Sequence, residues 1–128
     1  MRILAAAFAL AVLAFGGGAL AAGRFDAQRQ LSRYLLGPKM VRAEVVVMDR
    51  GALRDLRIDR GRIVRLRPAA IVVLERDGRR LAVSVAADAR VQVDSVDAPL
   101  AALRRGMIAT TVREGDGPAT QVFAVTVP

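Results

Sequence analysis

The stretch that decides the fold runs from Ile58 to Val93 and reads IDRGRIVRLRPAAIVVLERDGRRLAVSVAADARVQV. Its second half alternates, with Leu81, Val83 and Val85 on one face and small or polar residues on the other. A two-residue period built on β-branched side chains is typical of a half-buried strand. The shorter apolar run from Ile71 to Leu74 predicts a strand that is buried on much of both faces.

Turn residues separate these strands. Asp77-Gly78 lies between the two runs and predicts a type I′ hairpin, a turn that needs positive φ at both central residues. Upstream, residues 64–67 alternate apolar and basic, and Pro68 then marks a turn or an edge because it has no N–H to donate. Downstream, residues 90–93 alternate again. The whole stretch predicts a meander of antiparallel strands.

The composition indicates one small basic domain. The chain has 128 residues, of which 54% are hydrophobic and 25% are charged. Without the N-terminal apolar run, about a hundred residues remain, a usual size for one domain with one core. The sequence contains no cysteine, so no disulfide is predicted, and it contains no histidine or tryptophan. The net charge of +8, carried by arginines and the single lysine Lys39, favours anionic partners.

Two interpretations of residues 1–23 remain open. In a signal peptide, Arg2 would be the basic region, residues 3–15 the apolar core and residues 19–21 a small-x-small cleavage site. In an uncleaved anchor, residues 3–23 would be just long enough to cross a hydrocarbon core of about 30 Å. Both predict an exported domain, secreted or tethered to the outer face of the cytoplasmic membrane. The basic residues that follow would also fit the reversed orientation, since cytoplasmic flanks are normally basic.

Residues 24–40 are predicted to form a short helix and linker. Asp26 can cap the helix, and Gly37-Pro38 can end it. The apolar residues at helical spacing are Leu31, Tyr34 and Leu35. The alternative is a helix lying on a membrane surface, with the basic residues Arg29, Arg33 and Lys39.

Residues 41–128 are predicted to form the β domain. A valine-rich strand over 41–48 precedes a turn at Asp49-Arg50-Gly51, and the second Asp-Arg-Gly, at 59–61, is interpreted as another turn or a bulge. A short helix is predicted over 98–105, with Gly106 as its C-terminal cap. Two more strands are predicted over 107–113 and 119–127.

This order of elements predicts a mainly β fold. A helix between the third and fourth strands of a five-stranded Greek-key barrel is the layout of the OB fold. We therefore expect a small OB-like barrel of five to six strands, with one short helix near 98–105, behind an N-terminal apolar helix. A half-barrel or sandwich with the same order of elements is the alternative.

Several motifs carry a resemblance to a known family. They are Gly61-x-Ile63, the turn Glu75-Arg-Asp-Gly78, Val91-x-Val93, and Leu100-Ala-Ala-Leu-Arg-Arg-Gly-Met107. With them, the chain from about residue 57 to residue 125 resembles a family of small bacterial exported OB-like β-barrel domains of unknown function. The resemblance implies a barrel behind a signal or a single anchor, and it carries over no catalytic residue.

The resemblance does not imply a metal site. Some small periplasmic barrels of similar shape bind copper through His, Met and Trp. This sequence has no His or Trp. Its methionines after the apolar run lie far apart in the sequence, at Met40, Met48 and Met107.

The residues give little support to catalysis. An enzyme needs a nucleophile, a tuned acid or base, or a metal, and the commonest general base is absent. The serines, Ser32, Ser84 and Ser95, lack a glycine elbow and an obvious base. Two carboxylate pairs, Asp94 with Asp97 and Glu114 with Asp116, lack the dense ligand spacing of a calcium loop. We expect no enzyme activity, metal or cofactor; the alternative is an enzyme that uses loop carboxylates.

A basic stretch is the best functional feature. Seven arginines fall within 18 residues: Arg50, Arg54, Arg57, Arg60, Arg62, Arg65 and Arg67. The candidate anion-binding residues among them are Arg57, Arg60, Arg62, Arg65 and Arg67. Guanidinium groups bind phosphate and carboxylate groups well. On a regular strand, however, Arg62 and the neighbouring even positions face opposite to Arg65 and Arg67 unless a bulge at Gly61 resets the phase. The competing interpretation is a solvated arginine face paired with the interleaved aspartates.

The leading functional hypothesis is a non-enzymatic exported β-barrel module with a structural or protein-interaction role and an unidentified protein partner. The alternative is an electrostatic binder of anionic membrane lipid or envelope polymer, with residues 3–23 as a further route to the membrane. A nucleic acid is not expected as the partner. OB folds that bind nucleic acids stack bases on aromatic side chains, and Phe123 is the one aromatic residue of the barrel region.

Overall fold

The computed structural model describes residues 22–35 and 37–128, so the predictions for residues 1–21 lie outside the described residues. Within the described part, no helix is long and apolar enough to cross a membrane.

Helix α2 spans Ala22–Leu35. It begins earlier than predicted, and Asp26 therefore lies inside the helix instead of capping it. Leu31 and Tyr34 are exposed, so the sheet does not cover these side chains.

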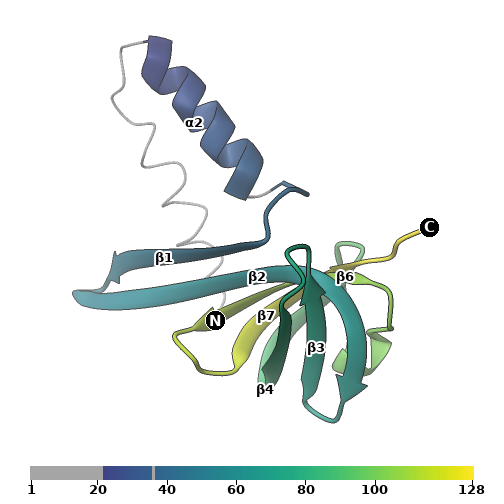
Figure 1. Ribbon diagram of the computed structural model, residues 1–128. Coiled ribbons are helices and arrows are strands. Elements are labelled where there is room, and N and C mark those ends of the chain that lie inside the picture. The colour runs from purple at the N-terminus through teal and green to yellow at the C-terminus, as the bar shows by residue number, and fades with distance from the viewer. Residues whose placement is uncertain (1–21, 36) are drawn as a thin grey trace.

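The rest of the chain is mainly strand, which confirms the predicted fold class at this level (Figure 1). The strands are β1 (Arg42–Asp49), β2 (Ala52–Arg67), β3 (Ala70–Glu75), β4 (Arg80–Val93), β5 (Val96–Asp97), β6 (Ile108–Glu114) and β7 (Ala119–Val125). The helix predicted over 98–105 is shorter than expected. Only one 3-10 turn forms, at Leu100–Ala102, because Leu103 already has extended backbone, with φ −68° and ψ 144°.

Five of the strands close into a ring of sheet. Their order is β2-β3-β4-β7-β6, and β6 pairs back on β2. Strands β4 and β7 are parallel, and the other neighbours in the ring are antiparallel. Strand β1 lies outside the ring as an antiparallel partner of β2, and Figure 1 shows this hairpin projecting away from the ring.

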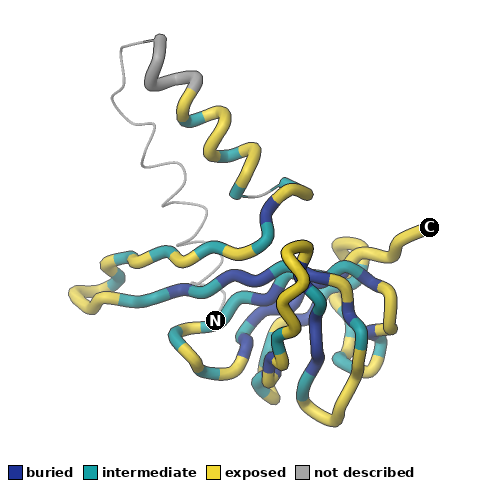
Figure 2. Tube along the Cα trace, in the orientation of Figure 1, coloured by how far each residue is buried: buried dark blue, intermediate teal, exposed yellow. Residues whose placement is uncertain are grey.

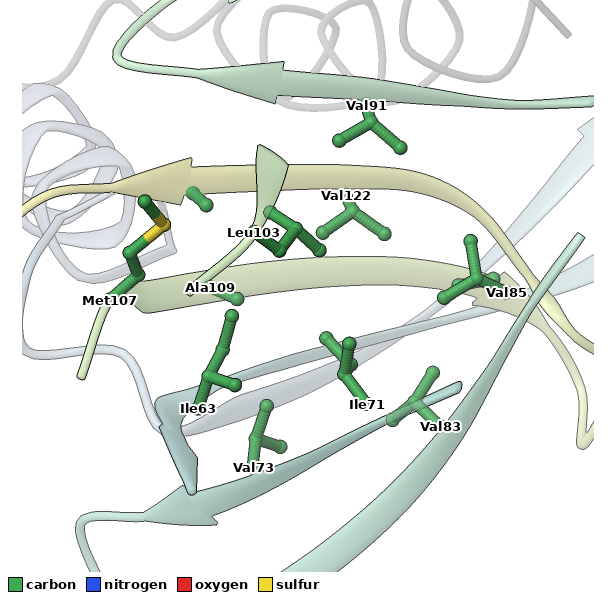
Figure 3. Close-up of a cluster of buried hydrophobic side chains, with 12 residues drawn as sticks. Ile63, Ile71, Val73, Val83, Val85, Val91, Leu103, Met107, Ala109 and Val122 are labelled. Carbon is green, nitrogen blue, oxygen red and sulfur yellow. The ribbon is translucent and has the colours of Figure 1, made fainter. Parts of the chain in front are cut away.

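The core fills the inside of the ring (Figure 3). Every strand of the ring contributes side chains: Ile63, Ile71, Val73, Val83, Val85, Val91, Ala109, Ala119, Val122 and Ala124. Leu103 and Met107, from the connection into β6, complete the cluster. Figure 2 shows that buried positions concentrate in the ring, whereas the tip of the β1–β2 hairpin is exposed.

The hairpin turns lie where the sequence places them, but one differs in type. Asp77-Gly78 connects β3 and β4, and Gly78 donates its N–H to the carbonyl of Glu75 at 2.9 Å. Only Gly78 has positive φ there, so the predicted type I′ geometry is wrong. Positive φ at both central residues occurs instead at Arg50 (51°) and Gly51 (78°), between β1 and β2.

The second Asp-Arg-Gly forms no turn, because residues 59–61 lie inside β2. Gly61 is required there by a close approach of two strands: a Cβ on Gly61 would lie 2.7 Å from the carbonyl oxygen of Leu74 in β3. A little further on, the β2–β3 register shifts between Ile63 and Arg65. Such bulges bend a strand, and the bend lets β2 pair with β1, β6 and β3 in turn.

Replacing Gly61 by alanine should therefore destabilise the ring. The added methyl group would force β2 away from the Leu74 carbonyl. We expect the free energy of unfolding to fall by about 2–3 kcal/mol in urea denaturation. The control is Ser84→Ala on the exposed surface of β4, which should change it by less than about 0.5 kcal/mol. A Gly61→Ala protein as stable as the wild type would show that this close approach is not a constraint.

Candidate functional site

The bulge in β2 decides where the arginines lie. The pairs across β2 and β3 are Arg62 with Leu74, Arg65 with Val72, and Arg67 with Ala70. Residues directly opposite each other share a face of the sheet. The β3 residues that alternate with these partners, Ile71 and Val73, belong to the core. Arg62, Arg65 and Arg67 therefore lie together on the outside of the ring, although their spacing along the chain is uneven.

Arg60 belongs to the same surface, because it lies two residues before Arg62 and no register shift separates the two. Its Nη1 donates to Oγ1 of Thr110 in β6 at 3.3 Å. Arg57 alternates onto the opposite face, where it forms ion pairs with Asp55, at 3.5 Å, and with Asp116. Four of the five predicted anion-binding residues thus share one surface, and Arg57 does not. We call Arg60, Arg62, Arg65 and Arg67 the outer arginine face.

Acidic partners distinguish Arg54 and Arg57 from these four arginines. Arg54 pairs with Asp49 at 3.0 Å and with Glu114 at 2.8 Å. The interpretation of arginines paired with interleaved acids therefore describes Arg54 and Arg57. Among the described residues, no carboxylate forms an ion pair with the outer arginine face. Three of its members are exposed and Arg60 is half-buried.

A cleft of about 380 Å³ lies beside Arg60 and Arg62. Its lining residues are Pro38, Met40, Arg60, Gly61, Arg62, Leu74, Glu75, Arg76 and Ile108. Arg76, like the outer arginine face, has no acidic partner among the described residues. Guanidinium groups next to aliphatic walls suit an anionic group attached to an apolar body.

The carboxylates considered for catalysis have structural partners. Asp94 accepts hydrogen bonds from the backbone N of Thr126 at 2.9 Å and from its Oγ1 at 2.7 Å, and these bonds lower the pKa of Asp94. Asp97 accepts from Nε2 of Gln92 at 3.1 Å and lies 3.5 Å from Nε of Arg90. Asp94 therefore ties the C-terminal segment to a turn, and Asp97 holds β5 to β4.

Two buried carboxylates lie on the inner side of the ring. Both were predicted to belong to turns. The side chains of Asp59 and Glu75 are 5% and 0% exposed. Oε2 of Glu75 accepts a hydrogen bond from Nε of Arg42 at 3.2 Å, whereas Oε1 has no hydrogen-bond partner. Oδ2 of Asp59 lies 3.7 Å from Nε of Arg113.

Burial is the main reason that the pKa of Glu75 is raised, and the negative charge of Asp59 raises it further. Arg42 and Arg79 oppose this shift without cancelling it. A sequence pattern could have revealed the burial, because Glu75 follows Ile71 and Val73 in the same two-residue phase.

Comparisons of the chain with protein families, with curated proteins and with solved structures found no match. Within the described residues, no group of three or more His, Cys, Asp or Glu side chains is arranged to hold a metal ion. The outer arginine face and its cleft are therefore interpreted from their own chemistry.

Glu75→Gln should gain stability relative to the wild type as the pH rises. Because folding raises the pKa of Glu75, its contribution to stability is fully present below the unfolded value, near 4.5, and is lost as the pH rises through the folded pKa. Glutamine does not ionise and escapes this loss. Urea denaturation between about pH 4 and pH 8 should show the difference, variant minus wild type, increasing with pH.

The matched control is Glu114→Gln. The hydrogen bond from Arg54 lowers the pKa of Glu114, so that carboxylate stabilises the fold above its unfolded pKa and the effect fades as the pH falls. Its difference from the wild type should change with pH in the opposite direction. A difference for Glu75→Gln that stays flat with pH would contradict a raised pKa at this residue.

Proposed function

We propose that residues 41–128 are an OB-like β-barrel domain of an exported protein, and that this domain is a non-enzymatic module which binds anionic lipid headgroups through the outer arginine face. The domain would be held at, or released from, the outer face of the cytoplasmic membrane by residues 1–23. Electrostatic binding of anionic lipid is the first candidate function, because the domain has a surface with suitable chemistry.

The strand order supports the OB-like assignment. Strands β2, β3 and β4 form a meander, the chain then crosses to β6 and β7, and the ring closes through β6 on β2. A Greek-key ring of five strands is the plan of that fold. The 3-10 turn at Leu100–Ala102 lies between the third and fourth strands of the ring, where the OB fold has its helix. Strand β1 is then an addition at the N-terminal side.

The observation that carries the functional proposal is the grouping of four arginines on one surface without acidic partners. An arginine such as Arg54, which already has two carboxylate partners, would have to give up ion pairs to bind another anion. The outer arginine face has no such pairs to lose among the described residues. Its guanidinium groups can therefore bind phosphate oxygens directly, and the cleft offers aliphatic contact next to them.

An anionic bilayer is favoured over a soluble polymer by the apolar segment. Whether it is an anchor or a signal peptide, residues 3–23 bring the chain to a membrane. Each arginine near an anionic surface contributes about 1 kcal/mol to membrane binding. Several together can hold a small domain at the surface reversibly, at moderate ionic strength.

A structural or protein-interaction role is the second candidate. It is favoured by the projecting β1–β2 hairpin, whose Val46, Met48 and Leu53 are exposed apolar side chains. Such side chains on a sheet edge are typical of surfaces that pair with another chain.

Binding to vesicles tests the first candidate. The full chain should partition more strongly onto phosphatidylglycerol-containing vesicles than onto neutral phosphatidylcholine vesicles, and added salt should reduce the difference steeply. Replacing Arg62, Arg65 and Arg67 by glutamine should lower the partition onto anionic vesicles about 100-fold, since each arginine contributes about 1 kcal/mol. Partition onto neutral vesicles should stay the same, because the apolar segment is unchanged.

The control removes three arginines that already have acidic partners, Arg54, Arg57 and Arg90. Both triple variants reduce the formal net charge by three, from +8 to +5, so that net charge alone cannot distinguish them. An equal loss in both variants, or salt-insensitive binding, would contradict the proposal. Binding to a soluble anionic polymer without binding to vesicles would assign the surface to an envelope polymer instead.

A further inference from the structure

Among the described residues, strand β1 is an edge whose outer side has no partner. It pairs with β2 along its full length, from Arg42 opposite Asp59 to Asp49 opposite Ala52. In the described part of the chain it is the one long strand that pairs with a single neighbour, since the five strands of the ring each have at least two. The free backbone groups of such an edge favour pairing with another strand.

The hydrogen-bond pattern shows which backbone groups point outward. Residues of an antiparallel strand bond to the neighbour alternately, and the N–H and C=O of the others point away. Just before β1, the carbonyl of Val41 accepts a hydrogen bond from the N–H of Arg60 at 2.9 Å. Odd-numbered residues of β1 therefore bond to β2. The free groups of the edge belong to Arg42, Glu44, Val46 and Met48.

This edge lacks three of the usual features that prevent pairing, namely a bulge, a proline and a lysine. The β1–β2 register runs without a shift, so no bulge twists the edge away, and β1 contains neither proline nor lysine. Val46 and Met48 are 62% and 67% exposed. Leu53, opposite Met48 on β2, is 72% exposed and extends the same apolar patch.

We propose that β1 pairs with β1 of a second copy of the chain, antiparallel, around a two-fold axis through Val46. A two-fold axis normal to the sheet keeps each side chain on its own face, and directly opposite residues share a face. Such a pair must therefore place one residue opposite its own copy. Val46 is in the set with free backbone groups, so Val46 opposite Val46 bonds the two edges through their free N–H and C=O groups.

Charge distinguishes this register from its neighbour. Glu44 and Arg50 are both exposed, and neither has an ion pair among the described residues. With Val46 on the axis, Glu44 lies opposite Met48 of the second copy and diagonal to Arg50 of that copy, and the contact occurs twice. Arg42 lies opposite the same Arg50, but its charge is already paired with Glu75 and Asp77. With Val45 on the axis, the two copies of Glu44 would lie diagonal to each other and repel. In the first register Val46 lies opposite Val46 of the second copy and diagonal to Met48 of that copy, so that the two apolar patches merge.

Sedimentation equilibrium of the full chain, in density-matched detergent, tests the proposal. The wild type should be dimeric at about 100 µM or below, and Val46→Lys should weaken the dimer at least about tenfold. Val46→Pro removes only an N–H that points away from β2, so it should also weaken association while the circular dichroism spectrum stays the same. The control is Val127→Lys, which introduces the same lysine at an exposed valine outside the strands. This variant should leave the dimer unchanged.

A charge swap tests the register. Glu44→Arg should weaken association, because it adds an arginine beside Arg42 and next to Arg50 of the second copy. Adding Arg50→Glu should restore association, because the interchain pair between positions 44 and 50 is then re-formed with opposite signs. A monomeric wild type would overturn the proposal. So would association that persists in Val46→Lys and Val46→Pro, since the contact would then lie elsewhere. Loss in Glu44→Arg without recovery in the double variant would overturn the Val46 register.

Discussion

The course of β2 is the constraint on which the rest of the structure depends. A single strand, Ala52–Arg67, pairs with β1, then with β6 and then with β3. It can do so because the absence of a Cβ at Gly61 lets the Leu74 carbonyl approach closely, and because a bulge follows between Ile63 and Arg65. Without this bend, β6 and β3 could not both reach β2, and the ring would remain an open sheet.

The same bulge organises the charges. It changes the phase of β2, so that arginines which would otherwise alternate between the two sides of the sheet end on the outside. On the inner side, Arg42 contacts both Glu75 and Asp77 and so ties β1 to the β3–β4 hairpin. The buried carboxylates Asp59 and Glu75 cost free energy to desolvate, and the nearby guanidinium groups partly offset that cost.

The two proposed surfaces use different physical forces and different parts of the chain. The outer arginine face lies on the curved end of β2, where guanidinium groups that have no acidic partner among the described residues favour anions. The β1 edge lies on the projecting hairpin, where free backbone groups and exposed valine and methionine favour another strand. Salt weakens the first interaction and affects the second much less, because hydrogen bonds and apolar contacts supply most of its stability. Binding to a membrane and pairing with a second copy can therefore occur independently.

The sequence alone predicted most of the strands, the hairpin turns and the mainly β class, because alternation and turn chemistry are local properties of the backbone, but it placed a turn or a bulge at residues 59–61, which lie inside β2. It overextended the helix over 98–105, where Leu103 leaves helical geometry and packs into the core. Only the tertiary structure decided that Asp59 and Glu75 are buried together and that Arg57 is separated from the outer arginine face. The first outcome depends on pairing between distant strands, which places Glu75 opposite Gly61. The second depends on the bulge, because a shift of one residue moves every later side chain to the other face, and so brings Arg65 and Arg67 onto the face of Arg62.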